Sequence, residues 1–327
     1  MKIELRHGAG GEDTERLIKE YFAEAFQNEY LEQMEDGAVL PVMQGNPVFT
    51  SDSFVVDPVE FPGGDIGRLA VCGTVNDLAS MGAKPLYLTA AFILETGLDS
   101  ELLQRVINSM ALTAKEAEVK IVAGDTKVVQ GQGGLYINTA GIGERAVDVH
   151  ISAGNLKIGD KLIVTGTLGD HHAVIMTQRL NIAAEVVSDC APLNGIVESL
   201  LAAGLPIHTL RDITRGGLAT VANELAGASR VCLELQEENL QMKQSVAGLC
   251  GILGLEPLYM GNEGKMLVAV PAEAAEEALA VIRQNKYGKE AAVVGEVVEG
   301  TGVYLHTRLG GRRKIMPLRG EGLPRIC

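Results

Sequence analysis

Short apolar runs with strand character alternate with longer segments of helical periodicity along most of the chain, and this alternation restricts the possible folds more than any other feature. The first helical segment places Leu17, Tyr21, Phe22 and Phe26 on one face. We predict further helices at 65–81, 100–118, 196–203, 217–226 and 272–282. We predict strands at 47–50, 85–94, 119–123, 135–143, 161–165, 231–235, 265–270 and 291–298. Because both halves of the chain mix the two elements, we expect an α+β fold.

A polar stretch punctuated by glycine near residue 153 predicts a boundary between two mixed α/β domains, at 1–150 and 151–309. The length of 327 residues is compatible with two domains. From residue 310 onward the chain is first basic and then rich in Gly and Pro. We therefore expect 310–327 to form a mobile tail without helix or ladder.

Charge and cysteine content narrow the classes of function. The net charge of −14 argues against a nucleic-acid partner, which needs a basic face, but not against a nucleotide whose charge a metal ion offsets. No apolar stretch reaches the roughly 18 to 20 residues of a membrane span, and the first residues lack the order of a signal peptide. The 5 cysteines include no Cys-x-x-Cys pair, which disfavours a disulfide framework and a thiolate zinc site. We expect a soluble protein of the reducing cytoplasm.

Three acidic residues each close an apolar run beside small residues or glycine: Asp52, Asp77 and Asp125. Carboxylates at the ends of strands or helices can converge on Mg²⁺, which prefers oxygen ligands and holds nucleotide phosphates. Taken singly, each acid fits a helix cap or a turn equally well. The early glycines Gly8, Gly10 and Gly11 could approach phosphates, although the Gly-Lys-Ser/Thr of a P-loop does not follow them.

Further polar residues are compatible with both a functional and a structural interpretation. Lys127 could contact phosphate or be a solvated surface charge, and Arg215 lies before a predicted helix where an anion site or a turn with its cap would fit. Glu263, in a turn flanked by glycine, could be a general base, although a turn role alone fits it better. For the paired His171 and His172 we favour a loop or capping role, because no third metal ligand is evident.

Cys327 differs from the other cysteines. Cys72, Cys190, Cys232 and Cys250 lie in apolar surroundings and are expected to be small buried hydrophobic residues. Cys327 ends a polar tail, and no prenylation motif is present because three residues would have to follow it. A thiol on a flexible tether is typical of a carrier that is loaded at one site and unloaded at another.

Several motifs together resemble the HypE family of hydrogenase maturation factors, which are carbamoyl dehydratases of the PurM-like superfamily typified by aminoimidazole ribonucleotide synthetase. The motifs are Gly-Gly-Asp-Ile-Gly at 63–67, Asn-Asp-Leu-Ala at 76–79, Gly-Asp-Thr-Lys-Val-Val at 124–129, Asp-Ile-Thr-Arg-Gly-Gly at 212–217, Asn-Glu-Gly-Lys at 262–265 and Pro-Arg-Ile-Cys at 324–327. The likeness covers essentially the whole chain, and the last motif is the most specific. One departure is His172, where the family usually has glycine, so no role is carried over to that loop.

The resemblance implies two PurM-like domains, with the N-terminal halves of two subunits meeting in a homodimer and ATP bound near that interface. It implies that Asp52, Asp77 and Asp125 are Mg²⁺–ATP ligands. The other nucleotide-site residues that it suggests are Gly8, Gly10, Gly11, Asp65, Asn76, Thr126, Arg215 and Gly216. A carbamoyltransferase, HypF, would load Cys327, and the finished cyanide would pass to iron on a HypC–HypD complex during [NiFe]-hydrogenase assembly.

The expected reaction is dehydration of a carbamoyl group on Cys327 to a thiocyanate, with ATP converting the carbamoyl oxygen into a leaving group. Lys127 and Glu263 are the candidate catalytic side chains, and the sequence leaves open which of them takes the proton. Two rivals remain: an ATP-dependent synthetase of the same superfamily acting on a soluble substrate, and a non-catalytic maturation scaffold switched by ATP. Neither rival requires catalysis that depends on Cys327.

Overall fold

The N-terminal domain is built on a four-stranded mixed sheet. The computed structural model describes residues 1–33 and 37–318. The strands are β1 (Asn46–Phe54), β4 (Lys84–Glu95), β5 (Lys120–Val129) and β6 (Leu135–Arg145). Their spatial order is β1-β6-β4-β5, with β4 and β5 parallel and the other pairs antiparallel. Each strand includes a predicted apolar run, and β1 and β5 continue beyond it because the polar residues that follow still pair in the sheet.

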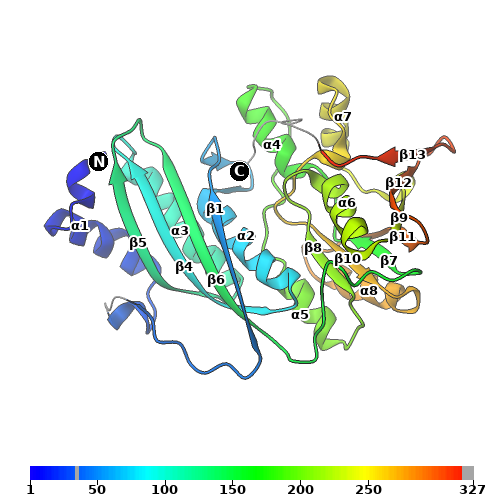
Figure 1. Cartoon of the computed structure of the whole chain (residues 1–327). Coiled ribbons are helices and arrows are strands. Elements are labelled where there is room, and N and C mark those ends of the chain that lie inside the picture. The colour runs from blue at the N-terminus through cyan, green and yellow to red at the C-terminus, as the bar shows by residue number, and fades with distance from the viewer. Residues whose placement is uncertain (34–36, 319–327) are drawn as a thin grey trace.

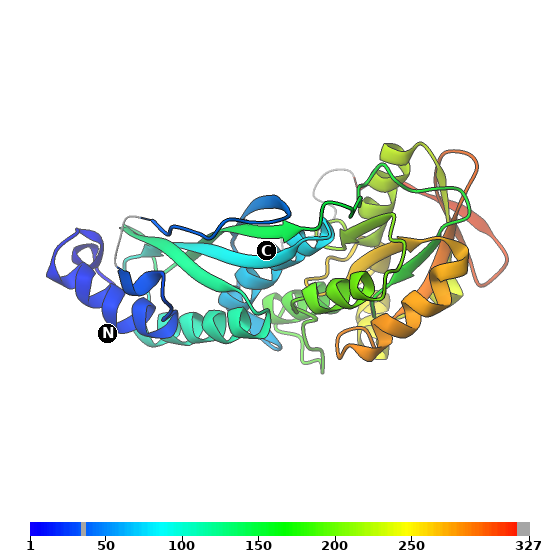
Figure 2. The same ribbon diagram turned by 90° about the horizontal axis from the view of Figure 1, so that it is seen from below.

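Two helices cover one face of this sheet, as Figure 2 shows from below. In α3 (Ser100–Glu116), Leu103, Val106, Ile107 and Met110 recur at three- and four-residue intervals and are fully buried. In contrast, α2 (Ile66–Ser80) is buried on nearly all sides, because it lies between the sheet and the second domain. The remaining short elements are the 3₁₀ turns Leu5–Gly8 and Leu31–Gln33, α1 (Glu12–Leu17), the π-helical turns Ile18–Ala23, β2 (Glu60–Phe61) and β3 (Gly64–Asp65).

The second domain is a seven-stranded sheet between two helical layers (Figure 1). In spatial order the strands are β13 (Arg312–Ile315), β12 (Gly302–His306), β9 (Cys232–Gln236), β11 (Ala292–Val298), β7 (Lys161–Val164), β10 (Met266–Val270) and β8 (Thr209–Asp212). The helices are α4 (Asp170–Arg179), α5 (Asn194–Ala202), α6 (Gly217–Ser229), α7 (Gln244–Leu253) and α8 (Ala275–Gln284).

Side chains that alternate along the central strands supply two separate cores. Leu162 and Leu267 pack in the cluster that contains α6, whereas Ile163 and Val268 pack in the cluster that contains α5 and α8. This explains why β10 is buried at every residue and reads as a continuous apolar run. Apolar residues of α4 and α7 belong instead to the core of the N-terminal domain, so the two domains are packed together.

The structure corrects the predicted start of the tail. Arg312–Ile315 form β13, which pairs with β12, so part of the segment expected to lack a ladder belongs to the sheet. The basic residues there are compatible with an edge strand, where their side chains reach solvent. Residues 319–327, including Cys327, lie outside the described part of the chain. Within that part, no helix combines the length and the hydropathy that a membrane crossing requires.

Candidate active site

Five acidic residues, Asp52, Asp77, Asp212, Glu224 and Glu263, line one cleft of about 670 Å³ between the two domains. Asp52 comes from β1, Asp77 from α2, Asp212 from the end of β8, and Glu263 from the loop before β10. The hydroxyl of Thr50 donates to Asp77 Oδ2 over 3.0 Å, which ties β1 to α2.

Glycine at position 73 of α2 allows this close approach of β1 to the helix. A Cβ there would lie 2.7 Å from the ring of Phe54.

Asp52, Asp77, Asp212 and Glu263 have raised pKa values, which indicates a site prepared for a cation. Burial raises the pKa of Asp52, and burial together with the nearby Asp52 raises that of Asp77. Burial and the Asp77 carboxylate raise the pKa of Asp212 to about 6. Burial raises the pKa of Glu263 well above its usual range, and Arg215 at the cleft partly offsets this.

The residues present suit Mg²⁺ held together with nucleotide phosphates. Such Mg²⁺ needs only one or two protein carboxylates, because phosphates and water complete its octahedral shell. Asp52 and Asp77 offer these oxygens, and Arg211 and Arg215 line the same cleft, where phosphate charge could be met. Among the described residues no cluster of three or more His, Cys, Asp or Glu side chains forms a protein-only metal cage.

A second cavity, of about 330 Å³, lies between the first segment of the chain and β5. Its apolar wall includes Ile18, Phe22 and Phe92, and its polar rim includes Asp125 and Lys127. Lys127 Nζ lies 2.5 Å from Asp125 Oδ1, and this contact lowers the pKa of Asp125. The cavity is also lined by the predicted residues Gly8, Gly10 and Thr126.

Glycine is required in the segment that closes this second cavity. A Cβ on Gly8 would lie 2.7 Å from the Val128 backbone nitrogen, and Gly10 has a φ of +82°. Gly11 is the residue before α1.

The three acids predicted to converge on Mg²⁺ do not meet within one chain. Through the register of the sheet, Ser53 on β1 is aligned with Asn138, Ala91 and finally Asp125 on β5. Asp125 is therefore three strand spacings from β1, or about 14 Å at about 4.8 Å a spacing. Asp52 and Asp77 share the cleft, whereas Asp125 belongs to the second cavity.

Three other predicted nucleotide-site residues have structural partners. Asp65 caps α2 by accepting a hydrogen bond from Arg68 N over 2.9 Å. The buried amide of Asn76 donates to Ala191 O over 3.1 Å and accepts from Leu193 N over 2.7 Å. Gly216 has a φ of +79° and ends the loop that brings Arg215 to the cleft.

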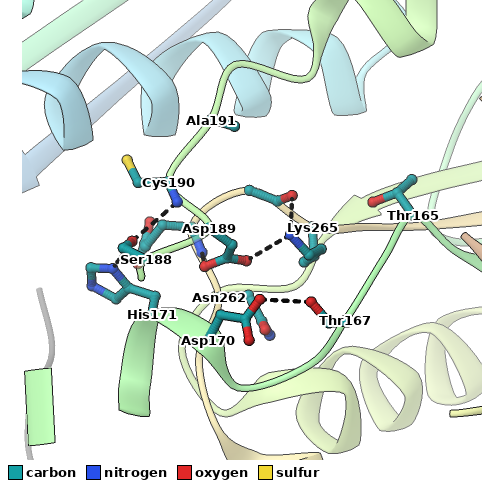
Figure 3. Close-up of polar contacts among 12 residues, drawn as sticks. Thr165, Thr167, Asp170, His171, Ser188, Asp189, Cys190, Ala191, Asn262 and Lys265 are labelled. Carbon is teal, nitrogen blue, oxygen red and sulfur yellow. Dashed lines mark hydrogen bonds and ion pairs between the residues drawn. The ribbon is translucent and has the colours of Figure 1, made fainter. Parts of the chain in front are cut away.

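Glu263 lies beside a buried polar network that the sequence did not reveal. Figure 3 shows Asp189 directed toward Lys265, whose ammonium lies 3.3 Å from Asp189 Oδ2. The backbone N–H of Glu263 donates to Asp189 Oδ1 over 3.2 Å. Asp189 lies in an irregular segment without hydrophobic periodicity, so no sequence signal singled it out. Asp212 begins the motif at 212–217, but its carboxyl is not among the predicted site residues, since it directly follows Arg211 and does not close an apolar run.

The histidine and cysteine predictions have different outcomes. His171 and His172 are buried in the first turn of α4, so the expected loop or capping role is wrong. His171 Nδ1 lies 2.8 Å from Ser188 Oγ, and burial lowers the pKa of His172 to about 4. The prediction of buried thiols is confirmed for the four described cysteines, Cys72, Cys190, Cys232 and Cys250.

The chain matches two domain families along most of its length. Residues 34–145 match the family described as AIR synthase related protein, N-terminal domain, and residues 157–308 match the corresponding C-terminal domain. Two relatives named carbamoyl dehydratase HypE are similar over nearly their whole length. The Escherichia coli (strain K12) protein is 46% identical, with 99% of each chain covered. The Azotobacter vinelandii protein is 45% identical, covering 99% of this chain and 97% of its own.

Solved structures of HypE proteins are also similar to this chain. A crystal structure of the hydrogenase maturation protein HypE in complex with ATP has a TM-score of 0.95 at 45% identity, with 99% of each chain covered. A HypE–HypF complex matches with a TM-score of 0.82 at 47% identity, over 92% of this chain and 99% of that one. Thiamine-monophosphate kinase from Stenotrophomonas maltophilia K279a, at 21% identity and a TM-score of 0.71 over 91% of this chain and 96% of its own, shares the fold. The chain therefore belongs to the HypE family of carbamoyl dehydratases of hydrogenase maturation, with two PurM-like domains.

Proposed function

We propose that this protein dehydrates a carbamoyl group carried on its own Cys327 to a thiocyanate, consuming ATP, and thereby supplies cyanide for hydrogenase iron. The observation that supports this most directly is the buried carboxyl of Glu263 in the same cleft as Asp52 and Asp77. This cleft therefore contains both a candidate proton acceptor, Glu263, and a candidate site for Mg²⁺ and nucleotide, at Asp52 and Asp77. ATP in the similar HypE structure agrees with this assignment.

The chemistry balances in two steps. Transfer of the γ-phosphoryl group to the oxygen of S–C(=O)–NH₂ gives S–C(=NH)–O–PO₃²⁻ and ADP, with loss of one proton. Cleavage of the C–O bond then expels phosphate while the remaining N–H proton leaves, and S–C≡N is formed. The bound Mg²⁺ would offset the charge of the phosphates.

In this proposal Glu263 accepts a proton and Lys127 stabilises the transferred phosphoryl group, or the two exchange these roles. Glu263 Oε1 forms no hydrogen bond within the described part of the chain, so this oxygen is available to a substrate N–H. Because its pKa is raised, Glu263 must first be ionised before it can act as a base. Positive charge bound in the cleft, or the loss of charge from a neighbouring carboxylate, would favour the ionised form.

A homodimer accounts for the separation of the predicted residues. Lys127 and Glu263 line different cavities of one chain, so joint action on one substrate requires residues from two copies. The face of the N-terminal sheet opposite α2 and α3 bears Phe49 and Ile93, with exposed fractions of 68% and 45%. Large apolar side chains of this kind on an uncovered sheet face are typical of a subunit interface. We propose that two such faces meet and bring Asp125 and Lys127 of one copy toward the cleft of the other.

For partners, we propose HypF as the carbamoyl donor and a HypC–HypD complex as the cyanide acceptor, in the cytoplasm. The HypF assignment is supported by the similar HypE–HypF complex. The HypC–HypD assignment and the location are predictions from the family resemblance.

Intact-protein mass spectrometry tests the proposal. The chain is incubated with HypF, carbamoyl phosphate and ATP, alongside Cys327→Ala. We expect carbamoylation of the wild type only, followed by loss of the mass of one water that depends on ATP.

If Cys327 stays unmodified beside active HypF while ATP is consumed, a soluble substrate must be sought. If Cys327 is carbamoylated but never loses water, the protein is a scaffold, and the dehydratase proposal fails.

A further inference from the structure

The bridging segment 188–193 connects the two halves of the proposed active site. On its N-terminal-domain side, Asn76 of α2 holds Ala191 and Leu193 by the hydrogen bonds described above. Asn76 is adjacent in sequence to Asp77 of the cleft. On the other side, Ala191 N donates to Glu263 O over 3.3 Å. The segment thus fixes the Glu263 loop relative to the helix that carries Asp77.

Asp189 is the side chain in this segment that contacts the Glu263 backbone. Its side chain is only 1% exposed, and its Oδ1 accepts from Glu263 N over 3.2 Å. The loop lies directly against the segment, since a Cβ on Gly264 would be 1.8 Å from Asp189 O. Both backbone polar groups of Glu263 are therefore held by residues of the bridging segment, while its Oε1 at the cleft has no hydrogen-bond partner among the residues that the structure describes.

Lys265 compensates the buried charge of Asp189. Its ammonium lies 3.3 Å from Asp189 Oδ2 and donates to Gly264 O over 3.3 Å, and its side chain is 9% exposed. The aliphatic part of Lys265 packs over Gly166, where a Cβ would approach Cε to 2.9 Å. A buried carboxylate is tolerated when such a partner is present, whereas leaving one charge unpaired is costly. Figure 3 shows Asp189 and Lys265 facing each other, joined by a dashed line.

We propose that Asp189 is a positioning residue for the dehydration: through its hydrogen bond to the Glu263 backbone, and with its charge balanced by Lys265, it holds the Glu263 carboxyl toward the reacting nitrogen. The inference rests on the proposed function, because it requires Glu263 to act on the substrate. It assigns Asp189 no contact with the substrate. Misplacement of a catalytic group by about 1 Å can cost about 100-fold in rate, so loss of this hydrogen bond should be measurable.

Two double variants isolate the hydrogen bond from the charge. Asp189→Asn with Lys265→Met is neutral and keeps an oxygen that accepts from Glu263 N. Asp189→Leu with Lys265→Met is also neutral and has a similar branched shape, but accepts nothing. Lys161→Met is the control, since Lys161 Nζ lies 2.5 Å from Glu296 Oε2 in an ion pair that is partly exposed, with exposed fractions of 33% and 44%.

The measurement is the single-turnover rate at which carbamoylated Cys327 loses water after ATP is added, together with the ATP dissociation constant and the melting temperature of each variant. We expect the Leu double variant to lose about 100-fold in rate with ATP affinity unchanged. We expect the Asn double variant to retain most of the rate, and the Lys161→Met control to match the wild type. If the Leu double variant does not fold, Asp189→Ala with Lys265→Met takes its place.

The possible failures can be told apart. Equal rates for the Leu and Asn double variants, whether both high or both low, overturn the positioning role of Asp189. A fall in ATP affinity that accounts for the whole rate loss overturns it as well. A wild-type chain that never converts carbamoylated Cys327 overturns the proposed function instead.

Discussion

Replacement of Asp212 by Asn should make the protein more stable, because this carboxylate is charged at neutral pH in an environment that favours its neutral form. The pKa of Asp212 rises from 3.8 to about 6 through burial and the nearby Asp77 and Asp52, with Arg211 opposing. Each pH unit between the two pKa values corresponds to about 1.4 kcal/mol. Charged Asp212 therefore lowers the free energy of unfolding by at most about 3 kcal/mol at neutral pH. Asp212→Asn removes the charge and keeps the shape.

The sign of the pH dependence follows from proton binding. Between about pH 4 and pH 6 the folded protein keeps the Asp212 proton while the unfolded chain has lost it. The stability that this proton provides is fully present below about pH 4 and is lost as the pH rises to about 6. The advantage of Asp212→Asn should thus be about 1.5 kcal/mol at pH 5 and about 3 kcal/mol at pH 7.5.

Urea unfolding of both proteins at these two pH values, with a chelator present, measures the difference. Asp148→Asn is the control. Asp148 is exposed in the segment that connects β6 to β7, so its replacement should change the free energy of unfolding by less than about 0.5 kcal/mol. Addition of Mg²⁺ and ATP should reduce the difference in free energy of unfolding between the two proteins, because the folded wild type would bind Mg²⁺–ATP more tightly than Asp212→Asn does. A difference between Asp212→Asn and the wild type that is absent, or equal at both pH values, would refute the electrostatic argument.

Three further substitutions test other parts of the structure. Burial opposes ionisation of Glu116, but hydrogen bonds from Lys286, Tyr287 and Arg68 lower its pKa to about 2. Glu116→Gln should therefore cost about 1 to 2 kcal/mol at pH 7 after solvent screening, and calorimetry should show the difference shrink as the pH falls below 4.5 and vanish at about pH 2. Gly264→Ala should lower the melting temperature and the dehydration rate together, because its Cβ would overlap Asp189 O; unchanged values of both would contradict the packing. Phe49→Glu should convert a dimer into a monomer in light scattering, whereas Val39→Glu, at a loop residue that is 88% exposed, should not; a dimer that persists in both excludes this sheet face as the interface.

Much of the fold could be predicted because its signals are local. The face formed by Leu103, Val106 and Met110 follows from helical spacing, and the uninterrupted apolar run at 266–270 indicates a strand buried on both sides. Short edge strands such as Arg312–Ile315 were missed, since a charged edge strand has the composition of a loop.

The candidate site was predicted less completely. Asp52, Asp77 and Glu263 were identified as acids at the ends of apolar runs or in a turn, and the structure brings them to one cleft. Asp125 has the same local signature, yet lies three strands away because β6 and β4 separate β5 from β1. Asp189 and Lys265 form their ion pair across a long stretch of sequence, so neither position has a neighbour in sequence that reveals the other.

The sequence by itself determined the alternation of strands and helices, the apolar faces of the helices, the family and the set of chemically capable residues, since these depend on residue type and spacing along the chain. Only the tertiary structure decided which of those residues share a cavity. It placed Lys127 with Asp125 and Glu263 with Asp52 and Asp77, and it turned Asn76 toward Ala191 and Leu193. The physical reason is that distances between side chains depend on strand order and on the packing of one domain against the other, and these are fixed by contacts between residues far apart in the sequence.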